Sequence, residues 1–360
     1  MTAKSAIRTE ADRLFAAFQQ AGAQPVDADI LLPAETLLDL YGEDIRARAY
    51  TTHDPLRGEM MLRPDFTVPV VQAHMAGGAD PARYCYLGEV FRQQDHDSRA
   101  SEYLQVGFEL FDRSAPEQAD AEVFALFANL LAPLNLHPVT GDIGILMAAV
   151  QGLNTPQNRK SALLRHIWRP QRFRHLLDLF AGRAAPSPAR LALLHRLANR
   201  PDLMTTVPHI GLRSPEDIAA RATALIADAK TPPLAAPEAA LLYDLLSLQA
   251  PAAAALTHLR GITPLLPAIA PAVDRFAARL DALSTRGIDP KTLAFEASLG
   301  RTTMEYYDGF TFCFLAPNLP AIASGGRYDA LTAVLGKGRQ IPAVGGIIRP
   351  ALVAQLRVRP

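Results

Sequence analysis

The sequence is poor in cysteine, with only Cys85 and Cys313 among its 360 residues. Two cysteines without metal-ligand spacing cannot build a disulfide framework, and they are typical of a reducing compartment. The charged N-terminal segment lacks the apolar stretch of a signal peptide, and no apolar run reaches the length of a membrane-spanning helix. We therefore expect a cytoplasmic protein with no membrane partner.

An excess of charge of either sign is also missing. Lys+Arg and Asp+Glu each number 36, so the formal net charge is zero. Arginine supplies almost all of the positive charge, because the sequence has few lysines. Proteins that bind nucleic acid usually carry a basic footprint, and none is visible over the whole chain. We therefore do not expect nucleic acid as a partner.

The motifs of common nucleotide, metal and nucleophile sites are absent from the sequence. There is no phosphate-binding loop, no dinucleotide glycine fingerprint and no serine flanked by glycines. No two histidines are four residues apart and no cysteines are paired, which argues against zinc. Asp95 and Asp97 begin like a calcium loop, but Ala100 and Val106 occupy its glycine and glutamate positions. We predict no metal and no cofactor.

Strand patterns occupy both ends of the chain, and helical patterns occupy the middle. Short turns join the predicted strands, for example around Asp54-Pro55-Leu56-Arg57-Gly58, which favours an antiparallel sheet. From about 154 to 280 the sequence is rich in Ala and Leu and shows no strand pattern. We predict an α+β fold, with an antiparallel sheet flanked by helices in residues 1–153 and 285–360, and a helical insertion module over 154–284.

The most informative stretch is a predicted hairpin over residues 84–111. In its second strand apolar side chains alternate with polar or small ones, which places one face of the strand on a core. The other face carries Gln105, Gly107 and Glu109 instead of the usual surface residues. Gly88 and Gly107 remove bulk where backbone or a ligand could approach closely. We interpret this face as the floor of a pocket.

Polar residues from three parts of the chain could complete that pocket. Carboxylates with a glutamine can hold an ammonium group, an arginine fork can hold a carboxylate or phosphate, and tyrosine hydroxyls can bind an imidazole. Together these residue types suit a free amino acid, although sheet-edge salt bridges and satisfied core polar groups would explain the same residues. The candidates are Asp65, Thr67, Arg92, Arg99, Gln105, Glu109, Glu305, Tyr306 and Tyr307.

Several elements of the sequence, in order, resemble the catalytic core of histidyl-tRNA synthetase, a class II synthetase. They cover roughly residues 5–150 and 290–350. The resemblance implies the fold of that class and a pocket for histidine. The elements are Leu62-Arg63-Pro64-Asp65-Phe66-Thr67, Phe91-Arg92 with Arg99, Gln105-Val106-Gly107-Phe108-Glu109, Glu305-Tyr306-Tyr307-Asp308-Gly309, and Gly325-Gly326-Arg327-Tyr328-Asp329 followed by Pro342-Ala343-Val344-Gly345.

The departures from that family affect its ATP and tRNA functions. Arg349-Pro350-Ala351-Leu352 stands where the family has a Gly-Leu-Glu-Arg that binds ATP, so Leu352 replaces the arginine. Thr302 stands at the family's catalytic arginine, with Arg301 one residue away, a shift that a bulge would allow, and Asp65 is shorter than the family's glutamate. The anticodon-binding domain of the family, about a hundred residues long, has only a short counterpart. Loss of the arginines removes electrostatic stabilisation typically worth several kcal/mol.

A synthetase core that keeps the amino acid pocket and loses the ATP and tRNA parts is similar to a known paralogous family. These paralogues are the regulatory subunits of short-form ATP phosphoribosyltransferase, which starts L-histidine biosynthesis. The resemblance implies no catalytic residues, a self-dimer, a hetero-oligomer with the catalytic subunit, and allosteric control by L-histidine. The alternatives are a working histidyl-tRNA synthetase or free-standing aminoacylase, and a catalytically inactive histidine-binding core with another partner.

The same resemblance implies roles within the histidine site. Asp65, Thr67 and Gln105 would hold the α-amino group. Arg92 and Gln105 would meet the carboxylate. Glu109 and Tyr307 would face the imidazole. Arg99 and Tyr306 complete the predicted set, and a histidine site at a subunit contact stays open as an alternative.

A basic cluster with the only tryptophan stands out in the helical region. It consists of Trp168, Arg169, Arg172, Arg174 and His175. In a synthetase such a cluster could touch tRNA. We interpret it instead as a solvated face or a subunit contact.

Overall fold

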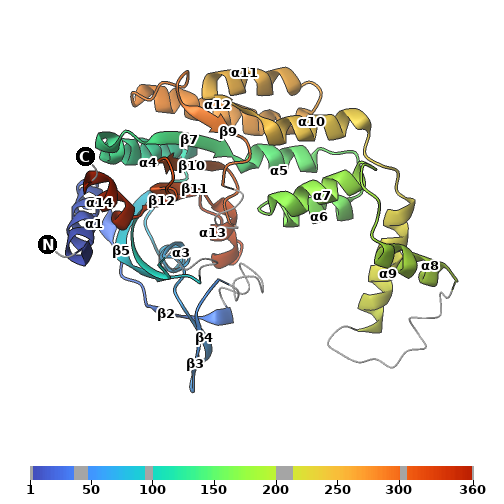
Figure 1. Cartoon of the computed structure of the whole chain (residues 1–360), viewed down its shortest axis with the longest axis horizontal. Helices are drawn as coiled ribbons and strands as arrows, with labels where there is room; N and C mark the ends of the chain where they lie inside the picture. Colours follow the sequence, from blue (N-terminus) through green and yellow to red (C-terminus); the bar gives the residue numbers. More distant parts are fainter. Residues whose placement is uncertain (1–2, 36–47, 94–99, 200–213, 301–305, 359–360) are drawn as a thin grey trace.

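A computed structural model describes residues 3–35, 48–93, 100–199, 214–300 and 306–358. At its centre lies a nine-stranded sheet (Figure 1), ordered β1-β5-β6-β12-β11-β10-β7-β9-β8. Neighbouring strands are antiparallel except for two parallel pairs, β1 with β5 and β7 with β9. The predicted α+β class is confirmed. The strands are Gln24–Pro25 (β1), Ala82–Phe91 (β5), Glu102–Phe111 (β6), His137–Asp142 (β7), Gln249–Pro251 (β8), Ala294–Glu296 (β9), Phe310–Leu315 (β10), Ala323–Arg327 (β11) and Ala343–Ile348 (β12).

A second, three-stranded sheet lies beside the first, in the order β2-β4-β3. Its strands are Leu31–Pro33 (β2), Thr51–Asp54 (β3) and Gly58–Leu62 (β4). The turn between β3 and β4 is held by Asp54, whose Oδ1 accepts hydrogen bonds from the backbone N–H groups of Leu56 and Arg57. This aspartate turn confirms the predicted hairpin around Asp54.

One face of the central sheet packs on helices, as the alternation in β6 predicts. Phe108 of β6 lies 5.4 Å, between ring centroids, from Phe18 of α1 (Ala3–Gln20). Phe18 in turn lies 5.3 Å from Phe127 of α4 (Pro116–Leu131). The last helix, α14 (Pro350–Val358), packs against α1, so the two ends of the chain lie side by side (Figure 1). The even-numbered side chains of β6 therefore form the core side of the sheet.

The glycines of the hairpin serve protein side chains and not a ligand. Gly107 pairs across the strands with Tyr86, and a Cβ on Gly107 would lie 2.0 Å from the Tyr86 ring. A Cβ on Gly88 would lie 2.6 Å from Nη2 of Arg63. The interpretation of these glycines as room for a ligand is therefore wrong, because the space above each is filled by a side chain. Phe66 stacks on Tyr86 with ring centroids 4.4 Å apart.

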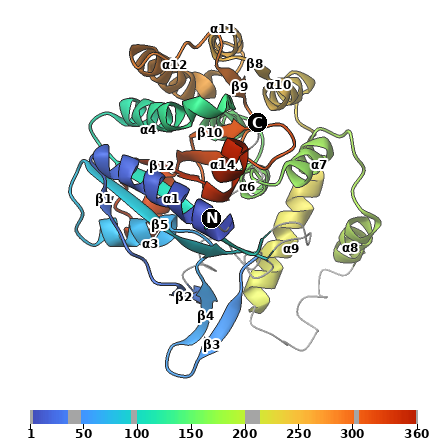
Figure 2. The same cartoon turned by 60° about the vertical axis from the view of Figure 1, so that its left-hand side comes forward.

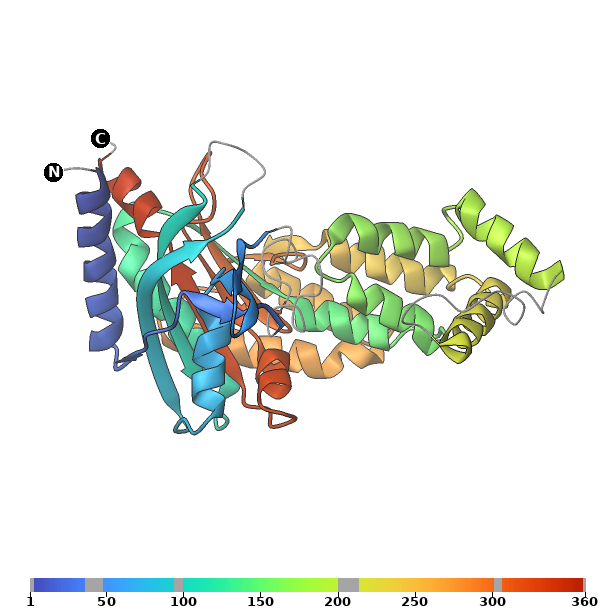
Figure 3. The same ribbon diagram turned by 90° about the horizontal axis from the view of Figure 1, so that it is seen from below.

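The middle of the chain forms helices that extend away from the sheet (Figures 2 and 3). In Figure 3, α8 and α9 lie farthest from it. Over the described ranges, no helix combines the length and apolar character that a membrane span requires. The remaining helices are Thr67–Met75 (α3), Ile143–Gln151 (α5), Gln157–Arg165 (α6), Pro170–Phe180 (α7), Pro188–Asn199 (α8), Pro215–Lys230 (α9), Ala236–Ser247 (α10), Ala252–Ile262 (α11), Ala270–Thr285 (α12) and Asp329–Leu335 (α13), with 3-10 turns Ala132–Leu134 (η2) and Pro267–Ile269 (η4).

The prediction that residues 154–280 contain no strand is wrong, because β8 lies in this range and pairs with β9. β8 has only three residues, Gln249-Ala250-Pro251, which is too short to show an alternating pattern. Its proline is tolerated because β8 is the last strand at this edge of the sheet.

Helix α12 is tied to the sheet-bearing part of the chain by buried ion pairs. Arg279 of α12 donates to Asp120 Oδ2 over 2.8 Å and to Asp142 Oδ2 over 2.9 Å. Arg327 of β11 shares Asp120 over 2.7 Å. The insertion boundary at 284 stays a prediction, and these contacts favour grouping residues 249–285 with the core.

Candidate functional site

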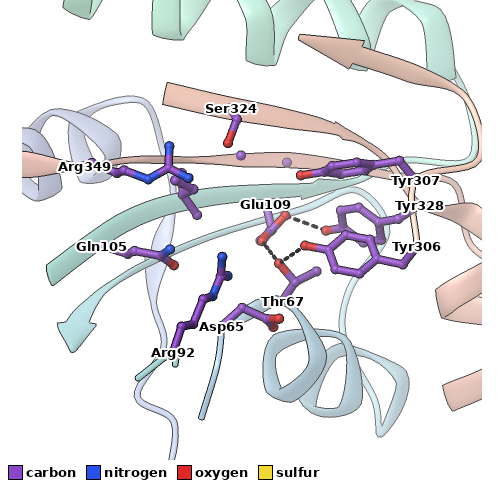
Figure 4. A pocket seen from close by; sticks show the side chains of 13 residues that line it. Asp65, Thr67, Arg92, Gln105, Glu109, Tyr306, Tyr307, Ser324, Tyr328 and Arg349 are labelled. Atoms are coloured by element: carbon purple, nitrogen blue, oxygen red, sulfur yellow. Dashed lines mark hydrogen bonds between the residues drawn. The ribbon is translucent and has the colours of Figure 1, made fainter. Parts of the chain in front are cut away.

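A polar pocket lies over β6, β11 and β12, at the start of α3 (Figure 4). Its floor is buried, whereas Arg92, Tyr306, Ile347 and Arg349 at its rim are half-buried. The cavity measures about 30 Å³, enough for very few water molecules, so a larger ligand has to displace rim side chains. The lining residues are Asp65, Thr67, Arg92, Gln105, Glu109, Tyr306, Tyr307, Ser324, Tyr328, Gly345, Gly346, Ile347 and Arg349.

The structure brings together almost all of the predicted site residues. Asp65, Thr67, Arg92, Gln105, Glu109, Tyr306 and Tyr307 all line this pocket. Arg99 and Glu305 lie outside the described residues. The sequence-based interpretation missed four side chains that also line the pocket, namely Ser324, Tyr328, Ile347 and Arg349.

Glu109 is the central acid of the pocket and is 1% exposed. Its Oε1 accepts hydrogen bonds from Thr67 Oγ1 and the Tyr86 hydroxyl, each over 3.0 Å, and its Oε2 accepts one from the Tyr328 hydroxyl over 2.6 Å. Burial raises the pKa of Glu109 to about 7, although these three donors oppose the rise. The carboxyl group is therefore held in one orientation and titrates near neutral pH.

A glycine on the neighbouring strand makes room for this carboxyl group. Gly345 of β12 is the cross-strand partner of Glu109. A Cβ on Gly345 would lie 1.5 Å from Glu109 Oε2, which no real structure tolerates. Gly345 is therefore required by the position of Glu109, and the resemblance alone gave no physical reason for it.

The start of α3 supplies the two residues beside Glu109. Thr67 is the first residue of α3, and besides donating to Glu109 it accepts a hydrogen bond from the Tyr306 hydroxyl over 3.3 Å. The Oδ1 atom of Asp65 lies 3.4 Å from the backbone N of Val68, so Asp65 lies near the helix start. Residue 66 is the N-cap and makes no side-chain cap bond. Asp65 and Thr67 are thus oriented toward the pocket (Figure 4).

Gln105 is the unusual polar group of the pocket floor. Its side chain is 0% exposed, yet among the described residues neither Oε1 nor Nε2 has a hydrogen-bond partner. A buried amide without partners costs about 1–3 kcal/mol for each lost bond. Figure 4 shows this amide facing the space between Arg92 and Arg349. A donor–acceptor group with no protein partner on a cavity wall indicates a ligand-binding surface.

Three tyrosines form the opposite wall of the pocket. The ring of Tyr306 lies 4.9 Å from that of Tyr307 and 5.9 Å from that of Tyr328, each in an edge-on arrangement. Burial raises the pKa of Tyr307, with the nearby Glu109 carboxyl as a smaller cause, so its hydroxyl stays protonated. These rings offer a half-apolar surface with hydroxyl donors at its edge.

The indole of Trp168 contacts this wall from behind. Its Nε1 donates to the backbone carbonyl of Tyr307 over 3.0 Å. Trp168 lies between α6 and α7 and is half-buried. Trp168 itself is therefore not part of a solvated face, because its N–H is used inside the protein, whereas Arg172, Arg174 and His175 of the same cluster are exposed. The contact connects the helical region with the pocket.

The pocket is polarised from one side to the other. Figure 4 shows Arg92, Gln105 and Arg349 on one side and the tyrosines on the other, with Glu109 and Thr67 between them. A group with a carboxylate at one end and a hydrogen-bonding ring at the other fits this order of charges. In the described part of the chain, no group of three or more His, Cys, Asp or Glu residues could hold a metal ion.

The fold and this pocket define a chain of the class II synthetase kind. The profile of the histidyl-tRNA synthetase family matches residues 2–351. An ATP phosphoribosyltransferase regulatory subunit/histidyl-tRNA synthetase from Bacillus halodurans superposes with a TM-score of 0.68 at 20% identity, over 98% of this chain and 79% of that one. A likeness at this identity supports the fold alone.

Relatives of higher sequence identity assign the chain to a particular family. A chain from Sinorhizobium medicae is 34% identical over 359 residues, covering 92% of this chain and 93% of the relative. One from Allorhizobium ampelinum is 32% identical over 349 residues, covering 91% and 92%. Both relatives are named ATP phosphoribosyltransferase regulatory subunit. The chain therefore belongs to the family of ATP phosphoribosyltransferase regulatory subunits, within the larger histidyl-tRNA synthetase family.

Proposed function

We propose that this chain has no catalysis of its own and joins a separate short-form ATP phosphoribosyltransferase catalytic subunit, which it makes active and sensitive to L-histidine. The names of its relatives support the regulatory role and the partner. The observation that supports a ligand is the Gln105 amide, which is fully buried and has no hydrogen-bond partner among the described residues, in a pocket that also holds acids, arginines and tyrosines.

The position of Leu352 supports the absence of ATP chemistry. Leu352 is half-buried and packs against the hydrophobic core, and it is not among the residues that line the pocket. An apolar side chain at that place offers no charge to a phosphate. The stabilisation that an arginine gives to a phosphoryl or adenylate transition state, typically several kcal/mol, is therefore not supplied by this residue.

The geometry supports a histidine orientation across the pocket. Asp65 and Thr67 would receive the α-amino group, and the α-carboxylate would lie toward Arg92 and Gln105. The imidazole would then meet Tyr307 and Glu109. A carboxylate can accept about four hydrogen bonds and Glu109 receives three, so one position on it is left for an imidazole N–H.

The proposal also includes a self-dimer and a cytoplasmic location. The self-dimer comes from the resemblance of the sequence to its family, and the cytoplasmic location from its few cysteines and its lack of a signal-peptide pattern. Sedimentation of the purified chain at micromolar concentration tests the dimer, for which we expect a single species of twice the chain mass.

A thermal-shift titration tests the ligand. A ligand that binds only the folded chain at 100 times its Kd stabilises it by roughly 2.7 kcal/mol. We expect millimolar L-histidine to raise the Tm, and leucine, which lacks the imidazole, to leave it unchanged. No shift with histidine would contradict the proposed pocket.

Reconstitution tests the regulatory role. We expect pyrophosphate-linked ATP phosphoribosyltransferase turnover only when the chain is mixed with a short-form catalytic subunit, and inhibition of that turnover by histidine. The chain alone is expected to give no ATP–pyrophosphate exchange with histidine. Exchange by the chain alone would instead establish a synthetase.

A further inference from the structure

Arg349 is a residue of the pocket that no predicted role accounts for. It follows β12 and precedes Pro350, the first residue of α14. Its side chain reaches into the pocket on the same side as Gln105 and Arg92 (Figure 4). The position is therefore well placed to contact the anionic end of a bound ligand.

The surroundings of Arg349 contain no counter-ion within the described residues. Its Nη1 donates to a backbone carbonyl, that of Ala321, over 2.5 Å. Burial lowers the pKa of Arg349, and the nearby charge of Arg92 contributes in the same direction. The other titratable groups facing it are Tyr103, Cys313 and Tyr307, none of which is a carboxylate.

Two buried arginines elsewhere in the molecule show which partner is missing beside the half-buried Arg349. Arg279 bonds two aspartates, and Arg327 bonds Asp120 and Asp329. Arg349 is the arginine among these three that faces a cavity and lacks such a partner in the described part of the chain. Burying a cation without an anion is unfavourable, so an anionic ligand beside it would be strongly stabilised.

We propose that Arg349 binds the α-carboxylate of the free amino acid, together with Arg92 and Gln105, and that this makes the pocket selective for ligands with a free carboxylate. The inference rests on the proposed function and deepens it. Gln105 would donate its Nε2 hydrogens to the carboxylate, and Arg349 would offer the fork of its guanidinium. Amino alcohols and amines with the same imidazole would lack this contact.

Ligand analogues and Arg349 variants together test this assignment. The ligands are L-histidine, histidinol, which has an alcohol in place of the carboxylate, and histamine, which has neither. Calorimetry would give Kd values for the full chain and for the variants Arg349→Met and Arg349→Lys. Arg357→Met is the matched control, because Arg357 lies in the same region at the end of α14, 39% exposed and paired with Glu10.

We expect a loss of affinity that requires both the substitution of Arg349 and a carboxylate on the ligand. In the wild type, histidine should bind about 10- to 100-fold more tightly than histidinol, the factor for one hydrogen bond to a charged group. Arg349→Met should remove most of that advantage and leave histidinol and histamine binding nearly unchanged. Arg349→Lys should lose part of it, and Arg357→Met none.

The outcomes separate this inference from the proposed function. Equal weakening of histidine and histidinol by Arg349→Met would overturn the inference, because it would mean a structural role. A fall in the Tm of ligand-free Arg349→Met well beyond that of Arg357→Met would likewise overturn it, since Arg349 would then have a protein counter-ion. Equal protection by inorganic phosphate would overturn the selectivity. A wild type that binds no histidine would overturn the proposed function as well.

Discussion

Two buried polar clusters occupy the two faces of the same sheet, and they differ in how their charges are matched. Ser324 and Arg327 of β11 are three positions apart, so their side chains leave opposite faces. Around Arg327 and Arg279, each guanidinium meets aspartates. In the pocket beside Ser324, the Gln105 amide has no hydrogen-bond partner in the described part of the chain.

This difference distinguishes buried polar residues that stabilise the fold from buried polar residues that are available to bind a ligand. Burying polar groups is unfavourable unless all of them are bonded, and the Arg279–Asp120 cluster meets that condition within the protein. Within the described residues the Gln105 amide in the pocket does not meet this condition, so a bound ligand could supply its missing partners. The comparison predicts that mutations in the two clusters change the free energy of unfolding with opposite signs.

The largest effect is expected for Arg279→Met in the matched cluster. The substitution leaves Asp120 and Asp142 with buried charge that has lost a partner, which typically costs about 3–5 kcal/mol. The measurement is the free energy of unfolding from urea denaturation. Arg286→Met is the control, because Arg286 is 35% exposed and lies 3.8 Å from Glu122, and it should cost under about 1 kcal/mol. Equal losses of unfolding free energy in Arg279→Met and Arg286→Met would contradict the stabilising role of the buried ion pairs.

A pH-dependent effect is expected for Glu109 in the pocket. Its pKa rises from 4.5 to about 7 in the folded chain. The folded state therefore binds this proton more tightly than the unfolded state. The contribution of protonated Glu109 to the free energy of unfolding is full below pH 4.5 and is lost as the pH rises through about 7. The difference corresponds to roughly 3 kcal/mol.

The comparison of the wild type with Glu109→Gln isolates this contribution. Burial also raises the pKa of Asp308 to about 7, and that contribution is common to both chains. Unfolding in urea at pH 4.5 and at pH 7.5, without histidine, should show a steeper loss for the wild type. The same loss in both chains would mean that Glu109 titrates normally.

A gain in stability is expected for Gln105→Leu, the opposite sign to Arg279→Met. The substitution removes a buried amide without partners, so the ligand-free chain should become more stable by about 1–2 kcal/mol. The Tm shift with histidine should disappear. Gln72→Leu is the matched control on the exposed side of α3, where the change should stay within about 0.5 kcal/mol. Destabilisation by Gln105→Leu would show that its amide is bonded in solution.

Pocket residues that lie in recognisable sequence motifs were predicted. Pocket residues that only the packing of the fold brings to the site were not. Asp65, Thr67, Gln105 and Tyr307 line one pocket as the resemblance implied. Arg349 was missed because it stands in the stretch that replaces the ATP-binding Gly-Leu-Glu-Arg of the family, where it received no role, and only the fold places its side chain in the pocket.

Other errors have the same origin in tertiary contacts. Gly107 was interpreted as room for backbone or a ligand, whereas the Tyr86 ring on the neighbouring strand fills its space. Trp168 stood in a basic stretch, and its bond to Tyr307 spans 139 residues, a separation that no local pattern records. Strand β8 is visible only through its pairing with β9.

The smallest energetic effect, with a direct optical readout, is expected at Trp168. It is the only tryptophan, and its Nε1 hydrogen bond to the Tyr307 carbonyl contributes about 0.5–1.5 kcal/mol. Histidine that orders the Tyr306–Tyr307 wall should change the polarity around the indole, so the emission should shift on saturation. Trp168→Phe should lose that amount of stability and bind histidine a few-fold more weakly, because the Tyr307 backbone is held less firmly. Gln105→Leu keeps the indole and should show no shift with histidine. An unchanged emission in a wild type whose Tm does rise would mean that the pocket fills without moving this wall, and that the helical region does not sense the ligand through Trp168.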